Sequence, residues 1–187
     1  MTTADHDRRG STNRGGLVPP EAAAACWTRA TSGWGDGDVT AGLSPRLRAV
    51  VDALPLRPGL RVLEVGGAPG AAARAVAQRV APDGHVLVVD RSATGVAATL
   101  RACASEVAAG LLSARCCAAA DLQPAPGEAP YDLAFACRVV AFDGRHPHLL
   151  DASVAGVRRL LVTDGRLLVD TGSPLRVLWP PDDGVAV

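Results

Sequence analysis

Two acidic side chains and a group of glycines have the types and the spacing to bind the adenosine part of a cofactor. Glu64 comes shortly before the glycines, which are Gly66, Gly67 and Gly70, and Asp90 follows about one strand–helix–strand unit later. Glycines allow a sharp turn close to a ligand, and the free N–H groups of a following helix point to the same place. A carboxylate at the end of the next strand accepts hydrogen bonds from both ribose hydroxyls. These residues predict a site for a nucleotide-type cofactor.

The elements that position these residues can be recognised in the same stretch of sequence. Apolar residues in 61–65 predict a short buried strand, and the alanine-rich run 71–80 has the composition of a helix. A second apolar strand, 86–89, ends in Asp90. Acidic residues often cap helices, but Ser92 is the better cap here, which leaves Asp90 free for the ribose.

The glycine spacing separates two classes of cofactor. A dinucleotide fingerprint reads G-x-G-x-x-G directly after the strand, and this chain does not fit it. Glu64, Gly66 and Gly70 instead resemble motif I, E/D-x-G-x-G-x-G, of class I S-adenosylmethionine-dependent methyltransferases. The chain departs from this motif at Ala68, whose methyl group would crowd a cofactor lying against the backbone. Two alternatives stay open: a strand–turn–helix without a ligand, and an NADP oxidoreductase in which Arg91 meets the 2′-phosphate.

The resemblance covers about residues 43–172 and implies a Rossmann-like α/β fold. Its sheet would be doubly wound and mostly parallel, with helices on both faces and a shortened C-terminal end. The resemblance also implies S-adenosylmethionine as the cofactor. The residues expected to contact it are Glu64, Gly66, Gly67, Ala68, Gly70, Asp90, Arg91, Asp121, Leu122 and Cys137.

The later contacts in this set come from the third and fourth expected strands. The third strand is expected around 114–119, and Asp121 and Leu122 follow it. In the family, Asp121 would accept a proton of the adenine amine while Leu122 packs on the ring; a loop acid in water is the alternative for Asp121. The fourth strand is expected at 131–136, and the resemblance implies that its end, at Cys137, faces the methyl donor.

The last part of the chain predicts a helix, a turn and the final strands. A helix is expected to end near Leu161, followed by a turn at Asp164-Gly165 and a strand that begins with 166–170. Residues 175–179 would form one edge strand, stopped by the two prolines that follow. An exposed sheet edge is a hazard that a partner chain removes, so a homodimer is kept as an alternative to a monomer.

Methyl transfer needs little covalent help from a protein, because alignment of the donor carbon with a nucleophile supplies most of the acceleration. A general base helps when the acceptor is a hydroxyl or a protonated amine. The loop 138–148 is where the family presents acceptor-side groups, and His146 is the first candidate because its ordinary pKa lies near neutrality. The alternative is that His146, which precedes Pro147, only begins the next helix. The Asn/Asp-Pro-Pro-Tyr tetrad of many N-methyltransferases is absent at 137–140.

The composition narrows the functional classes. The 187 residues carry 19 basic and 19 acidic side chains, and every basic residue is arginine, which excludes a P-loop lysine and a Schiff-base lysine. A neutral chain without a basic stripe is not expected to bind nucleic acid, so we expect a small-molecule acceptor. The 5 cysteines form no C-x-x-C pair, which predicts no metal site and a reducing cytoplasm. The bias toward alanine, arginine and glycine favours a GC-rich bacterial genome.

The chain divides into a tail and one domain. Residues 1–19 are polar and glycine-rich, predict a disordered tail, and lack the apolar core of a signal peptide. Within the domain 20–187, residues 20–56 are expected to form a helical cap or lid, 57–172 the cofactor-binding core and 173–187 a short edge segment. No run is long enough to span a membrane.

The cap should contain two helices, one over 21–30 and one over 46–54 that Ser44 caps. Trp27 and Trp34 are equally suited to a lid and to a core. The sequence therefore predicts a cytoplasmic S-adenosylmethionine-dependent methyltransferase of a small molecule. A non-catalytic module that binds the same cofactor and the NADP oxidoreductase are the alternatives.

Overall fold

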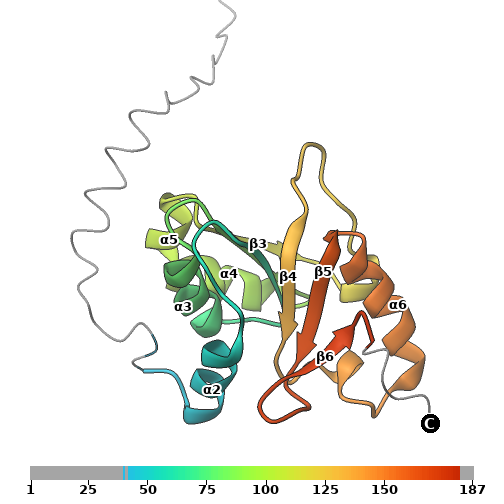
Figure 1. Ribbon diagram of the computed structural model, residues 1–187. Helices are drawn as coiled ribbons and strands as arrows, with labels where there is room; N and C mark the ends of the chain where they lie inside the picture. Colours follow the sequence, from blue (N-terminus) through green and yellow to red (C-terminus); the bar gives the residue numbers. More distant parts are fainter. Residues whose placement is uncertain (1–39, 41, 182–187) are drawn as a thin grey trace, which may run out of the picture.

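The apolar runs of the sequence form one six-stranded sheet in the order β3-β2-β1-β4-β5-β6 (Figure 1). The computed structural model describes residues 40 and 42–181. Neighbouring strands from β3 through β5 are parallel, whereas β6 pairs antiparallel with β5. The strands are β1 Arg61–Val65, β2 His85–Asp90, β3 Leu112–Cys116, β4 Tyr131–Ala136, β5 Leu161–Val169 and β6 Arg176–Trp179.

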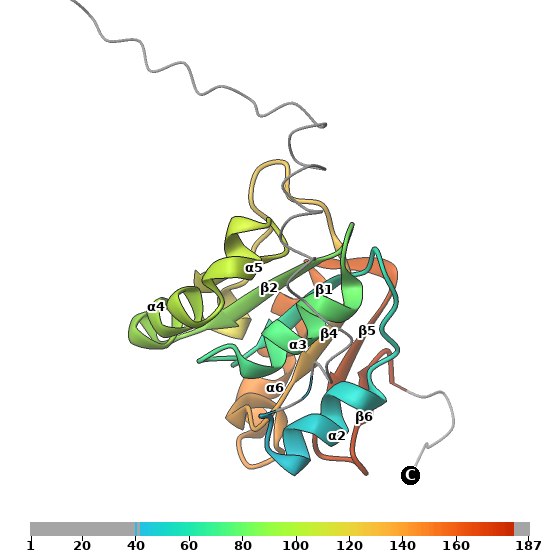
Figure 2. The ribbon, with the colours of Figure 1, turned by 90° about the vertical axis from the view of Figure 1, so that its left-hand side faces the viewer.

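Helices cover both faces of this sheet, which confirms the doubly wound α/β fold expected from the sequence. Figures 1 and 2 show α2, α3, α4 and α5 on one face and α6 on the other. The helices are α2 Pro45–Ala53, α3 Ala71–Val80, α4 Ala93–Ala102, α5 Ala104–Ala108 and α6 Pro147–Arg158, with 3₁₀ turns η1 Ala119–Asp121 and η2 Val140–Phe142. Alternate strand residues enter two separate cores, as the period of a strand requires. Val62 belongs to the core under α2 and α3, whereas Leu63 belongs to the core under α6.

The predicted helix starts and strand ends are largely confirmed. Ser44 accepts a hydrogen bond from the Leu47 amide at 3.3 Å and Pro45 is the first residue of α2. The Ser92 hydroxyl accepts a hydrogen bond from the Gly95 amide at 3.0 Å and so caps α4. The helix α3 and the strand β4 have their predicted bounds, and β2 ends at Asp90 as predicted but begins one residue earlier, at His85. The tail, the first helix of the cap and both cap tryptophans lie outside the described residues.

Two predictions about the third and fifth strands are wrong in detail. The third strand ends at Cys116, because the chain turns into η1 at Ala119. The fifth strand begins at Leu161, and Asp164-Gly165 lies within it instead of forming a separate turn. The reason is a bulge: Tyr131 of β4 pairs with Leu161, but the next partner pair joins Leu133 to Arg166, so β5 carries extra residues between them.

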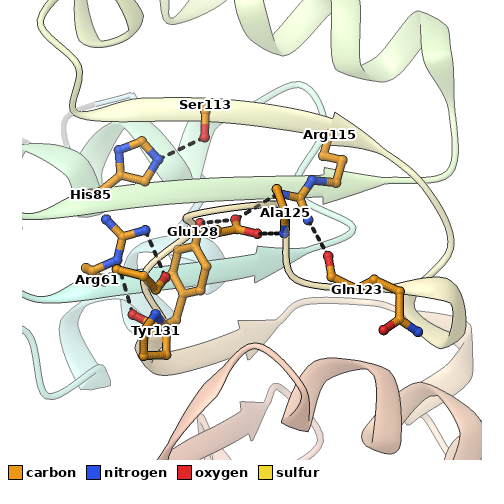
Figure 3. A network of polar contacts seen from close by, with 10 residues as sticks. Arg61, His85, Ser113, Arg115, Gln123, Ala125, Glu128 and Tyr131 are labelled. Carbon is orange, nitrogen blue, oxygen red and sulfur yellow. Dashed lines mark hydrogen bonds and ion pairs between the residues drawn. The ribbon is translucent and has the colours of Figure 1, made fainter.

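Figure 3 shows a polar network that fixes the long loop between β3 and β4 at the amino ends of β1, β2 and β4. The Glu128 carboxylate accepts hydrogen bonds from Arg115 at 2.8 Å, from the Tyr131 hydroxyl at 2.9 Å and from the Ala125 amide at 2.7 Å. These contacts hold the pKa of Glu128 below its ordinary value although burial opposes them. Ligands of open α/β sheets bind at the carboxyl ends of strands, so this network belongs to the scaffold and not to the site.

No helix in the described part of the chain is long and apolar enough to cross a membrane.

Candidate functional site

A hollow of about 360 Å³ opens where the carboxyl ends of β1, β2 and β4 meet η1 and α6. This is the edge where ligands of open α/β sheets bind, and its volume falls within the range of small-molecule sites. Most of its lining is apolar, and the charged members are Asp90, Arg91 and Arg138. The lining residues are Val65, Gly66, Val89, Asp90, Arg91, Cys117, Ala118, Ala119, Ala120, Arg138, Val139, Val140, Ala141, Leu149 and Ser153.

Gly66 forms the predicted turn at the end of β1 and lines the hollow. Its φ of 73° lies in the left-handed region, which favours glycine over residues with a side chain. A Cβ atom at this position would lie 2.6 Å from the Cγ2 atom of Val139, on the loop after β4. Glycine is therefore required by both the backbone and the close passage of this loop. The sequence predicts that the glycines leave room for a ligand, whereas in the structure the missing side chain of Gly66 leaves room for Val139.

Glu64 lies in the interior of β1 and is buried, with 3% of its surface exposed. Its Oε2 atom has no hydrogen-bond partner among the described residues. Burial raises the pKa of this carboxyl to about 8, although a hydrogen bond from the Ala73 amide opposes the shift; the negative charge of Asp90 adds to it. Glu64 is thus mostly protonated at neutral pH. It lies behind the lining of the hollow, and a Cβ atom on Gly67 would overlap its side chain.

Asp90 is half-buried at the end of β2 and lines the hollow, as the ribose prediction requires. Its Oδ1 atom accepts a hydrogen bond from the Ser92 amide at 2.8 Å. Ser92 itself caps α4, so Asp90 is not needed as the cap and its second oxygen is available to a ligand. Arg91 is the next lining residue and is exposed. The structure therefore places both residues where the sequence predicts them, and their contact with a cofactor stays a prediction.

The segment after β3 lines the hollow through residues other than those predicted. Leu122 was expected to pack on an adenine ring, but it is fully buried in the core under α6 and lines no part of the hollow. The Arg159 side chain donates hydrogen bonds to the carbonyls of Ala120 and Leu122 at 3.3 and 3.2 Å, which holds this turn against α6. The structure places Leu122 in the core directly after η1, and its contact with an adenine ring stays a prediction without support from the lining. Asp121 is exposed and outside the lining, so its adenine role is an untested prediction.

At the end of β4, the hollow is lined by the residue that follows Cys137, and the contact of Cys137 with a cofactor stays a prediction. Cys137 is half-buried and packs against the core under α2 and α3 instead of lining the hollow. Burial raises the pKa of its thiol to about 12, and the charges of Glu64 and Asp170 add to the shift. The following residue, Arg138, does line the hollow. Its amide donates a hydrogen bond to the Oδ1 atom of Asp170 at 3.0 Å.

His146 is exposed and is the N-terminal cap residue of α6, with Pro147 as the first residue of the helix. Its ring meets that of His148 edge-on, with 5.7 Å between the ring centres. It does not line the hollow. His146 does begin the next helix, and its role as a base stays a prediction without support from the lining.

Sequence reasoning missed Val140, Leu149 and Ser153, which line the hollow from η2 and α6. The position of Val140 just after β4 was the only available signal for it. Leu149 and Ser153 lie one turn apart on α6 and look like ordinary core residues in the sequence. Three residues predicted beside the glycine turn, Gly67, Ala68 and Gly70, are also outside the lining. No group of residues in the described part of the chain could hold a metal ion.

No protein-family model and no curated protein matches this chain. Its fold matches solved structures. The YcgJ protein from Bacillus subtilis is 21% identical with a TM-score of 0.52, and the match covers 66% of this chain and 49% of that one. The [4+2]-cyclase SpnF is 22% identical with a TM-score of 0.53, covering 66% and 42%.

A third solved structure is similar over more of this chain. Phosphoethanolamine N-methyltransferase 1 from Haemonchus contortus, in complex with phosphoethanolamine and S-adenosylhomocysteine, is 18% identical with a TM-score of 0.54, covering 81% of this chain and 33% of that one. The chain therefore spans about a third to a half of the length of these proteins. At these identities the comparison shows the fold alone, a Rossmann-like α/β fold that this chain shares with the N-methyltransferase and with the cyclase.

Proposed function

We propose that this chain binds S-adenosylmethionine at the hollow and transfers its methyl group to a small-molecule acceptor. The observation that carries the proposal is the joint position of Asp90 and Gly66 in one hollow at the carboxyl ends of neighbouring strands. A carboxylate with a free oxygen and a glycine turn are the two features that an adenosine ligand requires there. The Haemonchus contortus enzyme of the same fold, which was crystallised with S-adenosylhomocysteine, supports this choice of ligand.

The residues present fit this cofactor. Asp90 would accept hydrogen bonds from the ribose hydroxyls through the oxygen that Ser92 leaves free. The turn at Gly66 has no side chain and so lets a ligand approach the backbone. The unpartnered Oε2 atom of Glu64 lies against Gly67 of this glycine turn, and the protonated carboxyl would donate a hydrogen bond to the ligand or to an ordered water. When bound, the cofactor supplies a methyl group that its sulfonium already activates.

The lining limits what the protein itself can contribute to the chemistry. Asp90 is its only carboxylate among the described residues, and no histidine belongs to it. We therefore propose that alignment in a largely apolar hollow provides most of the acceleration, with no general base from the lining. The volume of about 360 Å³ and the absence of a basic stripe in the sequence support a small acceptor.

An enzyme with different chemistry is the second candidate, because one structure of the same fold is a [4+2]-cyclase. The non-catalytic module that binds the same cofactor stays an alternative from the sequence. An NADP oxidoreductase rests on Arg91 alone, and the glycine spacing does not favour it. The cytoplasmic location, the bacterial source, the homodimer and the division into tail, cap, core and edge segment stay proposals from the sequence.

Calorimetric titration of the full chain with S-adenosylmethionine, S-adenosylhomocysteine and NADPH tests the proposal. We expect S-adenosylhomocysteine to bind in the micromolar range, about −8 kcal/mol. Asp90→Ala should weaken it by about 1–3 kcal/mol, because the ribose hydroxyls lose their acceptor. Asp83→Ala, an exposed acid in the turn before β2, is the matched control and should bind normally. Tight binding of NADPH without binding of S-adenosylhomocysteine would overturn the proposal.

A further inference from the structure

Arg138 is the one residue other than glycine, among those described, whose backbone has a positive φ, at 57°. Residues with a side chain rarely adopt this left-handed conformation, which costs about 1–2 kcal/mol. Such strain gathers at functional positions, and Arg138 lies directly after β4 in the lining of the hollow. Glycine would satisfy the backbone better, so the arginine side chain needs a separate reason.

The surrounding structure holds Arg138 in this conformation through Asp170, at the end of β5. The Asp170 carboxylate accepts the Arg138 amide through Oδ1 and forms an ion pair with Arg46 of α2 through Oδ2 at 2.7 Å. Only 6% of the Asp170 side chain is exposed, so this anchor is shielded from water. This buried anchor fixes the backbone of Arg138 and therefore the place where its side chain enters the lining of the hollow.

The guanidinium of Arg138 has no hydrogen-bond or ion-pair partner among the described residues, although the residue is exposed and lines the hollow. Arg145 on the same loop shows the contrast, because its guanidinium pairs with Asp143 and is outside the lining. A free guanidinium beside a largely apolar hollow is suited to a carboxylate or a phosphate, which it can bind with two parallel hydrogen bonds.

Two of the three large apolar residues that the described surface exposes, Val140 and Leu149, also line this hollow and are 40% exposed each. Val140 is two residues after Arg138, and Leu149 faces the hollow from α6. Exposed apolar residues grouped at a hollow mark a binding surface. The arginine therefore lies beside an apolar surface at the open part of the hollow.

We propose that the acceptor is an amphipathic anion, with a carboxylate or phosphate that pairs with Arg138 and an apolar body that contacts Val140 and Leu149. This inference rests on the proposed function and adds a substrate class to it. The carboxylate of the cofactor itself has the same chemistry and is the competing source. We assign Arg138 to the acceptor because it shares the exposed apolar surface, whereas Asp90 and Gly66 belong to the ends of β2 and β1.

The test uses matched pairs of probes on the full chain saturated with S-adenosylhomocysteine. Benzoate and benzamide, octanoate and octanamide, and phenyl phosphate and phenol are titrated at constant ionic strength, and binding is followed by amide chemical shifts. We expect at least one acid to bind about 10- to 100-fold more tightly than its uncharged partner. Acids that fail to bind, or that bind no more tightly than their partners, overturn the proposal.

Two substitutions separate the side chain of Arg138 from its backbone. Arg138→Gln should remove the preference for the acid, and so should Arg138→Gly, which accepts the positive φ without strain and therefore keeps the fold. Arg145→Gln is the control and should keep the preference. A preference that survives in both Arg138 variants overturns the proposal.

Two further titrations show whether Arg138 binds the acceptor or the carboxylate of the cofactor. They also separate a failure of the acceptor assignment from a failure of the proposed function. S-adenosylhomocysteine and 5′-methylthioadenosine, which lacks the carboxylate, should each bind Arg138→Gln as they bind the unaltered chain. Loss of the first alone would assign Arg138 to the cofactor and overturn the acceptor assignment. If the unaltered chain binds no S-adenosylhomocysteine, the proposed function fails, and the acid and amide pairs titrated without it still decide whether Arg138 binds anions.

Discussion

The burial of the Glu64 carboxyl leads to a specific prediction of how the free energy of unfolding changes with pH. The pKa of Glu64 is about 8 in the folded protein, whereas its ordinary value is 4.5, so folding favours the protonated form. The stability contributed by protonated Glu64 is fully present below pH 4.5 and is lost as the pH rises toward 8. Between these values the free energy of unfolding should fall by about 1.4 kcal/mol per pH unit. The fall between pH 5 and pH 7 is then about 2–3 kcal/mol.

Glu64→Gln isolates this contribution, because glutamine has the same shape, does not ionise, and can still accept the hydrogen bond from the Ala73 amide. Urea unfolding of both proteins at pH 5, 6, 7 and 8, followed by far-ultraviolet circular dichroism, gives the difference in free energy at each pH. Titrating groups that do not interact with Glu64 cancel in that difference. We expect the glutamine variant to gain stability relative to the unaltered chain by about 2–3 kcal/mol from pH 5 to pH 7.

Glu128→Gln is the contrasting control, because contacts with Arg115, Tyr131 and the Ala125 amide lower the pKa of Glu128 instead of raising it. Its contribution is lost only as the pH falls below about 4.5, so its effect should be nearly constant from pH 5 to pH 8. A constant difference for Glu64→Gln over the same range would mean that Glu64 ionises normally, and the argument from its burial would be refuted.

Three further changes test the site. Gly66→Val should lower the affinity for S-adenosylhomocysteine at least 10-fold, as measured by calorimetry. It should also lower the free energy of unfolding by about 2 kcal/mol in urea, because the new side chain meets Val139 at a positive φ. His146→Ala should leave turnover on the true acceptor within about 2-fold, because His146 is outside the lining, and a 100-fold loss would restore it as the base. Asp170→Ala should lower the free energy of unfolding by about 2–3 kcal/mol, because it removes the acceptor of the Arg138 amide and the partner of Arg46.

Most of the fold could be predicted because each local signal agreed with the next. The strand and helix around Gly66 and the caps Ser44 and Ser92 follow from propensity, capping and apolar runs within a few residues of one another. The bulge in β5 could not be predicted, because a Gly beside an Asp is as typical of a turn as of a bulge. The pairing with β4 decides between them, and that pairing is a long-range property.

The same contrast between local signals and long-range packing explains which residues of the site could be predicted from the sequence. Asp90 and Gly66 were predictable because the end of a strand in an open α/β sheet fixes the side of the molecule where they lie. Leu122 and Cys137 were assigned by their order after a strand, and each proved to lie on the buried side of its turn. Order along the chain gives the right loop, but the turn geometry, which depends on packing against α6 or on Asp170, selects the residue that faces the hollow.

This distinction also indicates where specificity is encoded. The residues expected to hold the cofactor, such as Gly66 and Asp90, lie at or just after the carboxyl ends of strands, and the fold alone sets that position. Arg138, Val140 and Leu149 lie on a loop and a helix that only packing brings to the hollow, and nothing in the fold requires their types. On our proposal, the side chain of Arg138 is kept at this strained position because it binds the acceptor. We therefore expect substitutions in the residues after β4 to change the substrate without changing the affinity for the cofactor.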